Sequence, residues 1–148
     1  MIRKTNGRLT VCCAMLGLLL AFIWGNSLLP AAVSQTLSDN TQTLLLGFEH
    51  PELFSMLVRK CAHFLEFTAL GMLLSWHLRL NGKRTGHALR WGLLAACIDE
   101  GIQFFVPGRA PGLADVAIDF CGAAAGMVLL QMGYGILRRK QPIQHGGK

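Results

Sequence analysis

Four apolar runs, separated by short polar segments, dominate the chain. A helix needs about 20 predominantly apolar residues to cross a bilayer, and each run has roughly that length. The runs cover approximately residues 9–29, 59–78, 88–106 and 114–137. We therefore predict an all-α integral membrane bundle of four transmembrane helices, formed by a single domain over residues 1–148.

The segments between the runs carry turn and interface signals. Asn81-Gly82 marks a turn after the second run, and residues 107–113 contain prolines and glycines that cannot continue a helix. The longest loop, residues 30–58, is polar at first and becomes apolar from Leu44 onwards. A short amphipathic helix lying in the membrane interface before Arg59 is therefore an open expectation.

The first run has two interpretations, a retained span or a cleaved signal peptide. The basic residues Arg3, Lys4 and Arg8 precede it, and Ala32-Val33-Ser34 would be an acceptable cleavage site. Its most apolar part, Val11–Leu29, is longer than the roughly 7–15 residues of a typical signal peptide core. This length favours a retained span.

The charge distribution gives the predicted bundle an orientation. Charged residues make up only 15% of the chain, against about 25% in a typical soluble domain, and the mean hydropathy is +0.42. Of the 14 Lys and Arg residues, three lie in the N-terminal tail, four in residues 79–90 and four in the C-terminal tail. The opposite side has Arg59, Lys60 and Arg109. The positive-inside rule then places both termini in the cytoplasm of a multi-pass plasma (inner) membrane protein.

The same distribution excludes a nucleic-acid partner as the explanation of the net charge of +6. The basic residues flank apolar runs, and no zinc-finger, helix-turn-helix or RNP pattern accompanies them. Membrane lipids are the expected partners.

Small residues in the runs indicate helix packing. The five cysteines have no metal-ligand spacing and read as small buried side chains: Cys12, Cys13, Cys61, Cys97 and Cys121. Gly122 and Gly126 form a GxxxG pattern that lets another helix approach closely. We favour close packing within this bundle over a dimer contact.

The acidic residues are confined to one part of the sequence. All eight lie between Asp39 and Asp119, and none lies in the three segments predicted to be cytoplasmic. Glu66, Asp99 and Asp119 each lie seven residues from the predicted outer end of a span, or about 10 Å along a helix. Because charge inside the membrane is costly, these carboxylates indicate a functional site or a buried pair.

Helical spacing gathers further polar residues with them. Arg59, His63 and Glu66 share one stripe of the second span. Two pairs with i, i+4 spacing, Asp99 with Gln103 and Asp115 with Asp119, lie on the third and fourth spans. We predict one ligand-binding cluster near the outer surface, made of Arg59, Lys60, His63, Glu66, Asp99, Glu100, Gln103, Arg109, Asp115 and Asp119.

These residues resemble the VanZ-like family over almost all of the chain except the tails. The resemblance is carried by the segment from Arg59 to Gly71, by Asp99 to Arg109, by Asp115 with the two glycines of the GxxxG pattern, and by Asn26-Ser27 through Pro30. One departure is Asp119, where many members carry Asn. The resemblance implies a small inner-membrane protein, and the founding member is associated with low-level resistance to the glycopeptide teicoplanin.

The cluster is compatible with several functions. The first is binding or shielding of an outer-leaflet envelope component, such as a lipid-linked cell-wall precursor or a glycopeptide-related ligand, with Arg59, Lys60 and Arg109 holding its anionic groups. Arg109 could instead pair with Asp115 or Asp119. A purely structural polar lock between helices is the alternative to any ligand, although interhelical hydrogen bonds contribute only about 0.6–2 kcal/mol.

An enzyme is the second possibility, so whether the chain is catalytic stays open. His63, Glu66, Asp99 and Glu100 are the candidate acid–base residues. A divalent metal held by His63, Glu66, Glu100 and Asp115 would account for the excess of acids. Proton or cation transport is a third possibility, but the lack of acids in the cytoplasmic half of each span favours a one-sided pocket.

Overall fold

The computed structural model describes residues 2–30, 36, 51–109 and 112–139, and within these residues the secondary structure is entirely helical. The helices are α1 (Ile2–Ser27), α3 (Pro51–Leu80), α4 (His87–Phe104) and α5 (Leu113–Arg139). The all-α prediction is thus confirmed for this part of the chain. Each of the four predicted runs corresponds to one of these helices.

The largest boundary difference is at the start of α3. The helix begins at Pro51, eight residues before Arg59, where the second span was expected to start. Proline is tolerated in the first turn of a helix, because the backbone N–H that it lacks has no helical partner there. Residues 51–58 are therefore helical and continuous with Arg59, whereas the earlier part of the expected interfacial helix lies outside the described residues.

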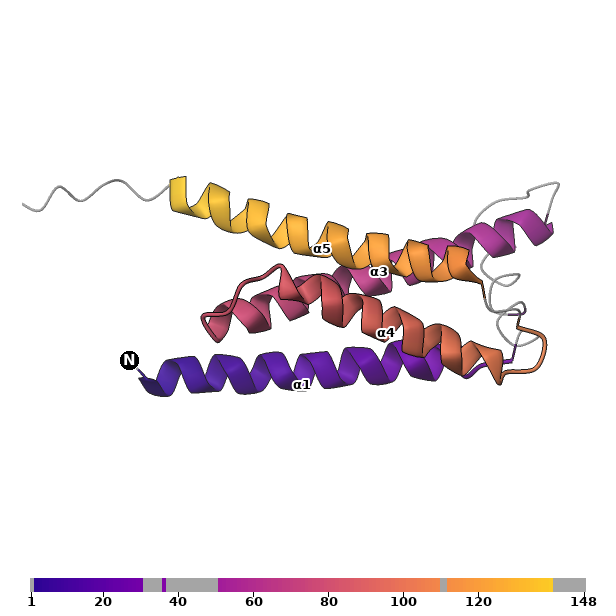
Figure 1. Ribbon diagram of the computed structural model, residues 1–148, viewed down its shortest axis with the longest axis horizontal. Coiled ribbons are helices and arrows are strands. Elements are labelled where there is room, and N and C mark those ends of the chain that lie inside the picture. The colour runs from indigo at the N-terminus through magenta and orange to yellow at the C-terminus, as the bar shows by residue number, and fades with distance from the viewer. Residues whose placement is uncertain (1, 31–35, 37–50, 110–111, 140–148) are drawn as a thin grey trace, which may run out of the picture.

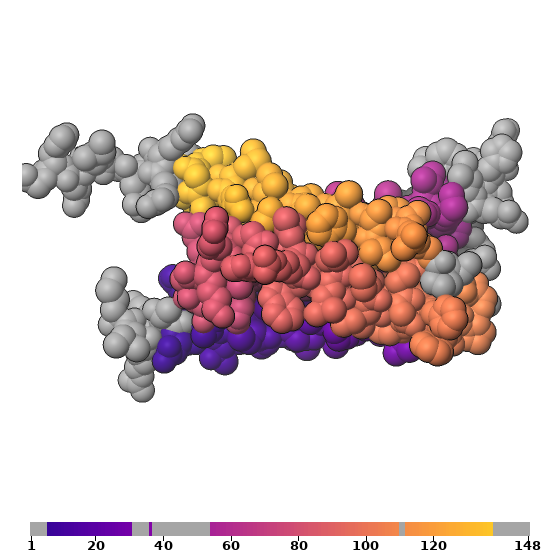
Figure 2. Space-filling view, in the orientation of Figure 1, coloured from indigo at the N-terminus to yellow at the C-terminus, as the bar shows by residue number. Residues whose placement is uncertain are grey.

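Successive helices run in opposite directions along one bundle (Figure 1). The N-terminal end of α1, the turn between α3 and α4, and the C-terminal end of α5 lie at the same end (Figure 1). α3 and α4 each contact the three other helices, while the described residues of α1 and α5 do not contact one another. Figure 2 shows the side chains of α4 filling the surface between α1 and α5.

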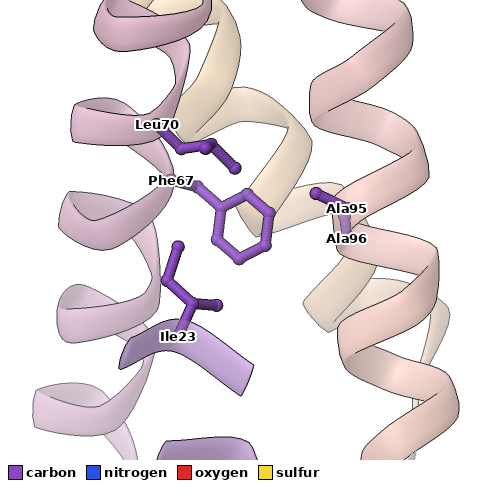
Figure 3. Packing of buried hydrophobic residues seen from close by; sticks show 5 residues of the cluster. All are labelled: Ile23, Phe67, Leu70, Ala95 and Ala96. Atoms are coloured by element: carbon purple, nitrogen blue, oxygen red, sulfur yellow. The ribbon is translucent and has the colours of Figure 1, made fainter. Parts of the chain in front are cut away.

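A small apolar core joins three of the helices. Ile23 of α1, Phe67 and Leu70 of α3, and Ala95 and Ala96 of α4 are buried against one another (Figure 3). Figure 3 shows the Phe67 ring lying between the Ile23 side chain and the two alanines. The small alanine side chains leave room for this ring, so α3 and α4 can pack closely.

The glycines of α5 explain why α5 lies so close to α3. A Cβ atom on Gly122 would lie 2.5 Å from the Phe64 carbonyl oxygen, and one on Gly126 would overlap the Thr68 carbonyl oxygen. Gly71 of α3 meets the Ala123 backbone in the same way. The GxxxG pattern therefore packs within the bundle, as the sequence analysis favoured.

The exposed surface is strongly apolar. Large apolar side chains point outward from all four helices, for example Leu18 (73% exposed), Leu65 (64%), Trp91 (55%) and Met132 (58%). By length and composition, two helical segments could cross a membrane, Asn6–Ser27 and Leu113–Leu137. α3 and α4 carry most of the charged residues of the predicted site, and such residues lower the hydropathy of a helix.

Candidate functional site

Asp99 is the most completely enclosed acid of the predicted cluster. It is 0% exposed, near the C-terminal end of α4. The Ser27 hydroxyl of α1 donates a 2.7 Å hydrogen bond to Asp99 Oδ1, and the Gln103 amide donates a 2.9 Å bond to Oδ2. Gln103 reaches Asp99 because the i, i+4 spacing places both on one helix face. These bonds fix the carboxylate and connect α1 to α4.

His63 of α3 lies between Asp99 of α4 and Asp119 of α5. Its Nδ1 atom is 3.7 Å from Asp99 Oδ2 and 3.6 Å from Asp119 Oδ1. Asp119 is only 1% exposed, and no described group donates a hydrogen bond to its Oδ1 atom. Three helices thus bring one imidazole and two buried carboxylates together.

A narrow cavity opens beside His63 and Asp119. Its volume is about 10 Å³, which is about the space of one water-sized group. It is lined by Arg59, Lys60, His63, Gln103, Asp115, Ile118 and Asp119. The interior can therefore admit a water molecule or a single ion, while a larger ligand would have to lie at the mouth.

Two basic residues stand at that mouth. The Lys60 ammonium lies 2.8 Å from Asp115 Oδ1, and both side chains are about one-third exposed, 32% and 35%. Such a partly exposed pair contributes at most about 1 kcal/mol. Arg59 has no carboxylate within ion-pair distance in the described part of the chain. One guanidinium is therefore available to an anionic group.

Glu66 faces α1 rather than His63. The Asn26 amide of α1 donates a 3.3 Å hydrogen bond to Glu66 Oε1. The second carboxylate oxygen of Glu66 is buried and has no hydrogen-bond partner among the described residues. The shared stripe predicted for Arg59, His63 and Glu66 thus extends from the cavity to the α1–α3 contact.

Glu100 of α4 contacts the segment that joins α4 to α5. Its Oε1 atom accepts a hydrogen bond from the backbone N–H of Gly112, next to the start of α5. Its other oxygen is buried without a described partner. Glu100 therefore helps to hold the loop between α4 and α5 and does not line the cavity.

Arg109 has partners that the sequence analysis did not anticipate. Its guanidinium donates to the backbone carbonyls of Leu29 (3.2 Å) and Asn26 (3.4 Å), at the C-terminal end of α1. Carbonyls at the C-terminal end of a helix carry partial negative charge, which a cation complements. The Asn26 carbonyl also accepts a hydrogen bond from the backbone N–H of Leu29 (3.2 Å). Burial, followed by the nearby charge of Arg59, lowers the pKa of Arg109. The guanidinium still remains protonated at neutral pH, because arginine side chains are not deprotonated in proteins.

The structure thus divides the ten predicted residues into three groups. Arg59, Lys60, His63, Gln103, Asp115 and Asp119 line the cavity, and Asp99 lies directly behind His63. Glu66 contacts α1, while Glu100 and Arg109 bind backbone groups at the end of the bundle where α4 is joined to α5. Among the described residues, His63, Asp99 and Asp119 lie close enough together to share a metal ion. Of the four metal ligands suggested from sequence, only His63 belongs to this group. The other three, Glu66, Glu100 and Asp115, have other partners.

Asn26 and Ser27 were missing from the predicted site. They supply the α1 contacts to Glu66 and Asp99. The sequence signal for these two residues is a pair of polar side chains near the end of an uncharged apolar run, shortly before Pro30. Placing an uncharged polar side chain in a membrane costs much less free energy than placing an acid there, so such residues are a weaker signal of a functional site.

Comparison with known proteins supports the resemblance seen in the sequence. A family model described as VanZ/LLP1 matches residues 11–136, which include all of α3 and α4, most of α1 and α5, and every residue of the predicted site. No curated protein and no solved structure gives a significant match.

Proposed function

The chain belongs to the VanZ/LLP1 family, and from this premise we propose that it is a multi-pass plasma membrane protein acting in the cell envelope. All four helices cross the bilayer, with both termini on the cytoplasmic side. The cavity mouth faces outward, where Arg59 and Lys60 bind an anionic group of an outer-leaflet envelope component, such as a lipid-linked cell-wall precursor. This binding modulates sensitivity to glycopeptides of the teicoplanin type.

The distribution of polar and apolar side chains supports the four spans. Large apolar side chains face outward on every helix, while the side chains buried inside include Ser27, Ser75, Asp99, Gln103 and Asp119. A soluble bundle would expose its polar side chains instead. An apolar exterior with polar groups facing the interior is the arrangement expected when lipid surrounds the bundle.

The arrangement of the chain ends supports the orientation. The N-terminal end of α1, the C-terminal end of α5 and the turn between α3 and α4 lie at one end of the bundle (Figure 1). In the sequence, the N-terminal tail, residues 79–90 and the C-terminal tail contain 11 of the 14 basic residues. The positive-inside rule assigns such an end to the cytoplasm, so the cavity opens toward the outer leaflet.

The observation that carries the binding role is the Arg59 guanidinium, which lines a cavity with acidic walls and has no ion-pair partner among the described residues. Asp99 accepts hydrogen bonds from Ser27 and Gln103, and Asp115 pairs with Lys60. A guanidinium forms bidentate hydrogen bonds with phosphate or carboxylate groups. Because the interior holds only a water-sized group, the anionic head group binds at the surface of the mouth.

Retention of lipid by the purified protein tests this function. Protein extracted in mild detergent is examined by native mass spectrometry, and we expect an anionic envelope lipid bound to the wild-type chain. Loss of a charge-assisted hydrogen bond costs about 1.5–3 kcal/mol, so Arg59→Gln should reduce retention by about tenfold or more. Arg84→Gln, an exposed position on the turn between α3 and α4, is the matched control and should retain the lipid.

Either of two results would contradict the binding role. The first is a wild-type chain that carries no anionic lipid, and the second is equal retention by Arg59→Gln. The cellular counterpart is the teicoplanin concentration that inhibits growth of cells expressing each variant. Arg59→Gln should lose the effect of the wild-type protein, while Arg84→Gln should keep it.

An intramembrane enzyme acting on a lipid-linked substrate is the second candidate function. The position of His63 beside two buried carboxylates favours it, because such neighbours orient an imidazole for acid–base chemistry. Incubation with a lipid-linked precursor, followed by mass spectrometry, should then give a product whose formation stops in His63→Gln. A mixture unchanged relative to buffer would exclude this reaction.

A further inference from the structure

We infer that His63, Asp99 and Asp119 form a binding site for one divalent transition-metal ion, of the zinc or manganese class. The three residues come from α3, α4 and α5, and one ligand atom of each lies within 4.8 Å of the other two. This site is independent of the lipid-binding role, which depends on Arg59 at the cavity mouth.

The separations between these atoms fit ligands that share an ion. His63 Nδ1 lies 3.7 Å from Asp99 Oδ2 and 3.6 Å from Asp119 Oδ1. Both distances are too long for good hydrogen bonds, which have donor–acceptor distances of about 2.7–3.2 Å. Two ligands bound tetrahedrally at about 2.1 Å from one metal ion are about 3.4 Å apart. Small side-chain rotations would therefore bring all three atoms to coordination distance.

An unsatisfied carboxylate oxygen is the second, independent indication of a ligand. Asp119 is 1% exposed, and its Oδ1 atom, which faces His63, has no hydrogen-bond partner within the described chain. Leaving a buried polar group unpaired costs about 1–3 kcal/mol, and more for a charged group. A bound cation would satisfy this oxygen.

The surroundings of Asp99 resemble the outer shell of a metal site. Ser27 and Gln103 each donate a hydrogen bond to one of its carboxylate oxygens and so fix the orientation of the group. Each oxygen has a second lone pair, and that of Oδ2 is free to bind an ion on the side of His63. Hydrogen bonds of this kind orient metal ligands and strengthen binding.

Charge and ligand type limit the choice of ion. Two carboxylates and a neutral imidazole give the ligand set a charge of −2, which a divalent cation balances. Calcium and magnesium prefer ligand sets made only of oxygen atoms, whereas imidazole suits zinc and carboxylates suit manganese. The adjoining cavity has room for one water-sized group, so it can supply a water as a further ligand.

Metal analysis of the detergent-purified full chain tests this site. We expect about one equivalent of zinc or manganese per chain, and rebinding of Zn²⁺ by calorimetry after removal of metal with a chelator. Asp119→Asn, which preserves the size of the side chain, should weaken Zn²⁺ binding by at least about 100-fold. Ser27→Ala should weaken it by about 10–100-fold, as expected for an outer-shell contact.

Asp115→Asn is the matched control for Asp119→Asn. It removes an acid from the same helix, one turn earlier, where the carboxylate pairs with Lys60. This variant should keep its metal. Equal loss in the two variants, or a wild-type chain that neither retains nor rebinds an ion, would refute the site.

A spectroscopic measurement keeps the test valid if Asp119→Asn does not fold. Circular dichroism and gel filtration establish whether the variant is helical and monodisperse. Co²⁺ added to the metal-free wild-type chain should give saturable visible absorption bands that Zn²⁺ removes. If no such bands form, the site does not exist.

Discussion

Replacing Gly126 with alanine should separate α3 from α5 and destabilise the bundle. The added Cβ atom would overlap the Thr68 carbonyl oxygen and lie 2.8 Å from the Met72 nitrogen. These neighbours are backbone atoms, so they cannot rotate away as a flexible side chain could. The two helices would have to move apart by at least about 1.5 Å to restore normal contacts, which lie at about 3.5–4 Å.

The cost of this movement can be bounded. A gap of about 0.5–1 Å between two atoms removes a quarter to a half of their van der Waals attraction energy. Overpacking a core typically lowers stability by about 1–3 kcal/mol. Because α3 and α5 pack backbone to backbone over several turns, we expect a value near the upper end. The free energy of unfolding should fall by about 2–3 kcal/mol.

Unfolding in mixed micelles with increasing SDS, followed by circular dichroism, measures this change. Gly135→Ala is the matched control on the same helix, because a Cβ atom there would have no neighbour within 4 Å. Its stability should be unchanged or slightly higher, since alanine is the better helix former. A loss below about 0.5 kcal/mol for Gly126→Ala, or equal losses in both variants, would refute the close packing.

Three further predictions address the polar contacts and the topology. Ser27→Ala removes a hydrogen-bond donor to buried Asp99 and should lower the unfolding free energy by about 1–2 kcal/mol in the same assay. Ser75 is also 0% exposed but has no hydrogen-bond partner among the described residues, so Ser75→Ala should leave the unfolding free energy nearly unchanged. Arg109→Ala removes the guanidinium that donates to the Leu29 and Asn26 carbonyls and should cost about 1–2 kcal/mol, while Arg84→Ala on the exposed turn should cost less than about 0.5 kcal/mol. Equal effects would contradict the contact to α1. A reporter enzyme active only outside the cytoplasm should be inactive when fused after Lys148 and active when fused after Pro107, and activity after Lys148 would overturn the proposed orientation.

The helices could be predicted from sequence because hydrophobicity varies strongly along this chain. Their ends were harder to place. The sequence predicts that a span starts at Arg59, because charge usually marks the edge of an apolar run. Charge does not end a helix, however, and the backbone hydrogen bonds of α3 continue back to Pro51. Hydropathy therefore locates the apolar segment, while the helix itself extends beyond it.

The candidate site was predictable where its residues are acidic or share helical spacing. Asp99 with Gln103 follows directly from the i, i+4 rule, and the cost of buried charge indicated that His63 and Asp119 would face the interior. The partner of Arg109 was not predictable, because backbone carbonyls have no sequence signal. The contributions of Asn26 and Ser27 depend on how far α1 reaches along the bundle, which sequence spacing within one helix does not specify.

The excess of acids over bases has a structural explanation in the division of the site. Asp99, Glu66 and Glu100 each accept a hydrogen bond from a neutral donor, and Asp115 accepts one from Lys60. Of the five acids, Asp119 alone has no hydrogen-bond donor within the described chain. We therefore expect the interior of the cavity to attract a cation at Asp119 and its mouth to attract an anion at Arg59.

This separation makes the two proposals independently testable. Arg59→Gln should reduce lipid retention and leave the metal content unchanged, whereas Asp119→Asn should remove the metal and leave the lipid bound. A polar lock that only joins the helices predicts a different outcome, because each variant would then change stability without selective loss of either ligand. Measuring lipid, metal and unfolding free energy on the same two variants therefore distinguishes a lipid-binding mouth, a metal-binding interior and a structural lock.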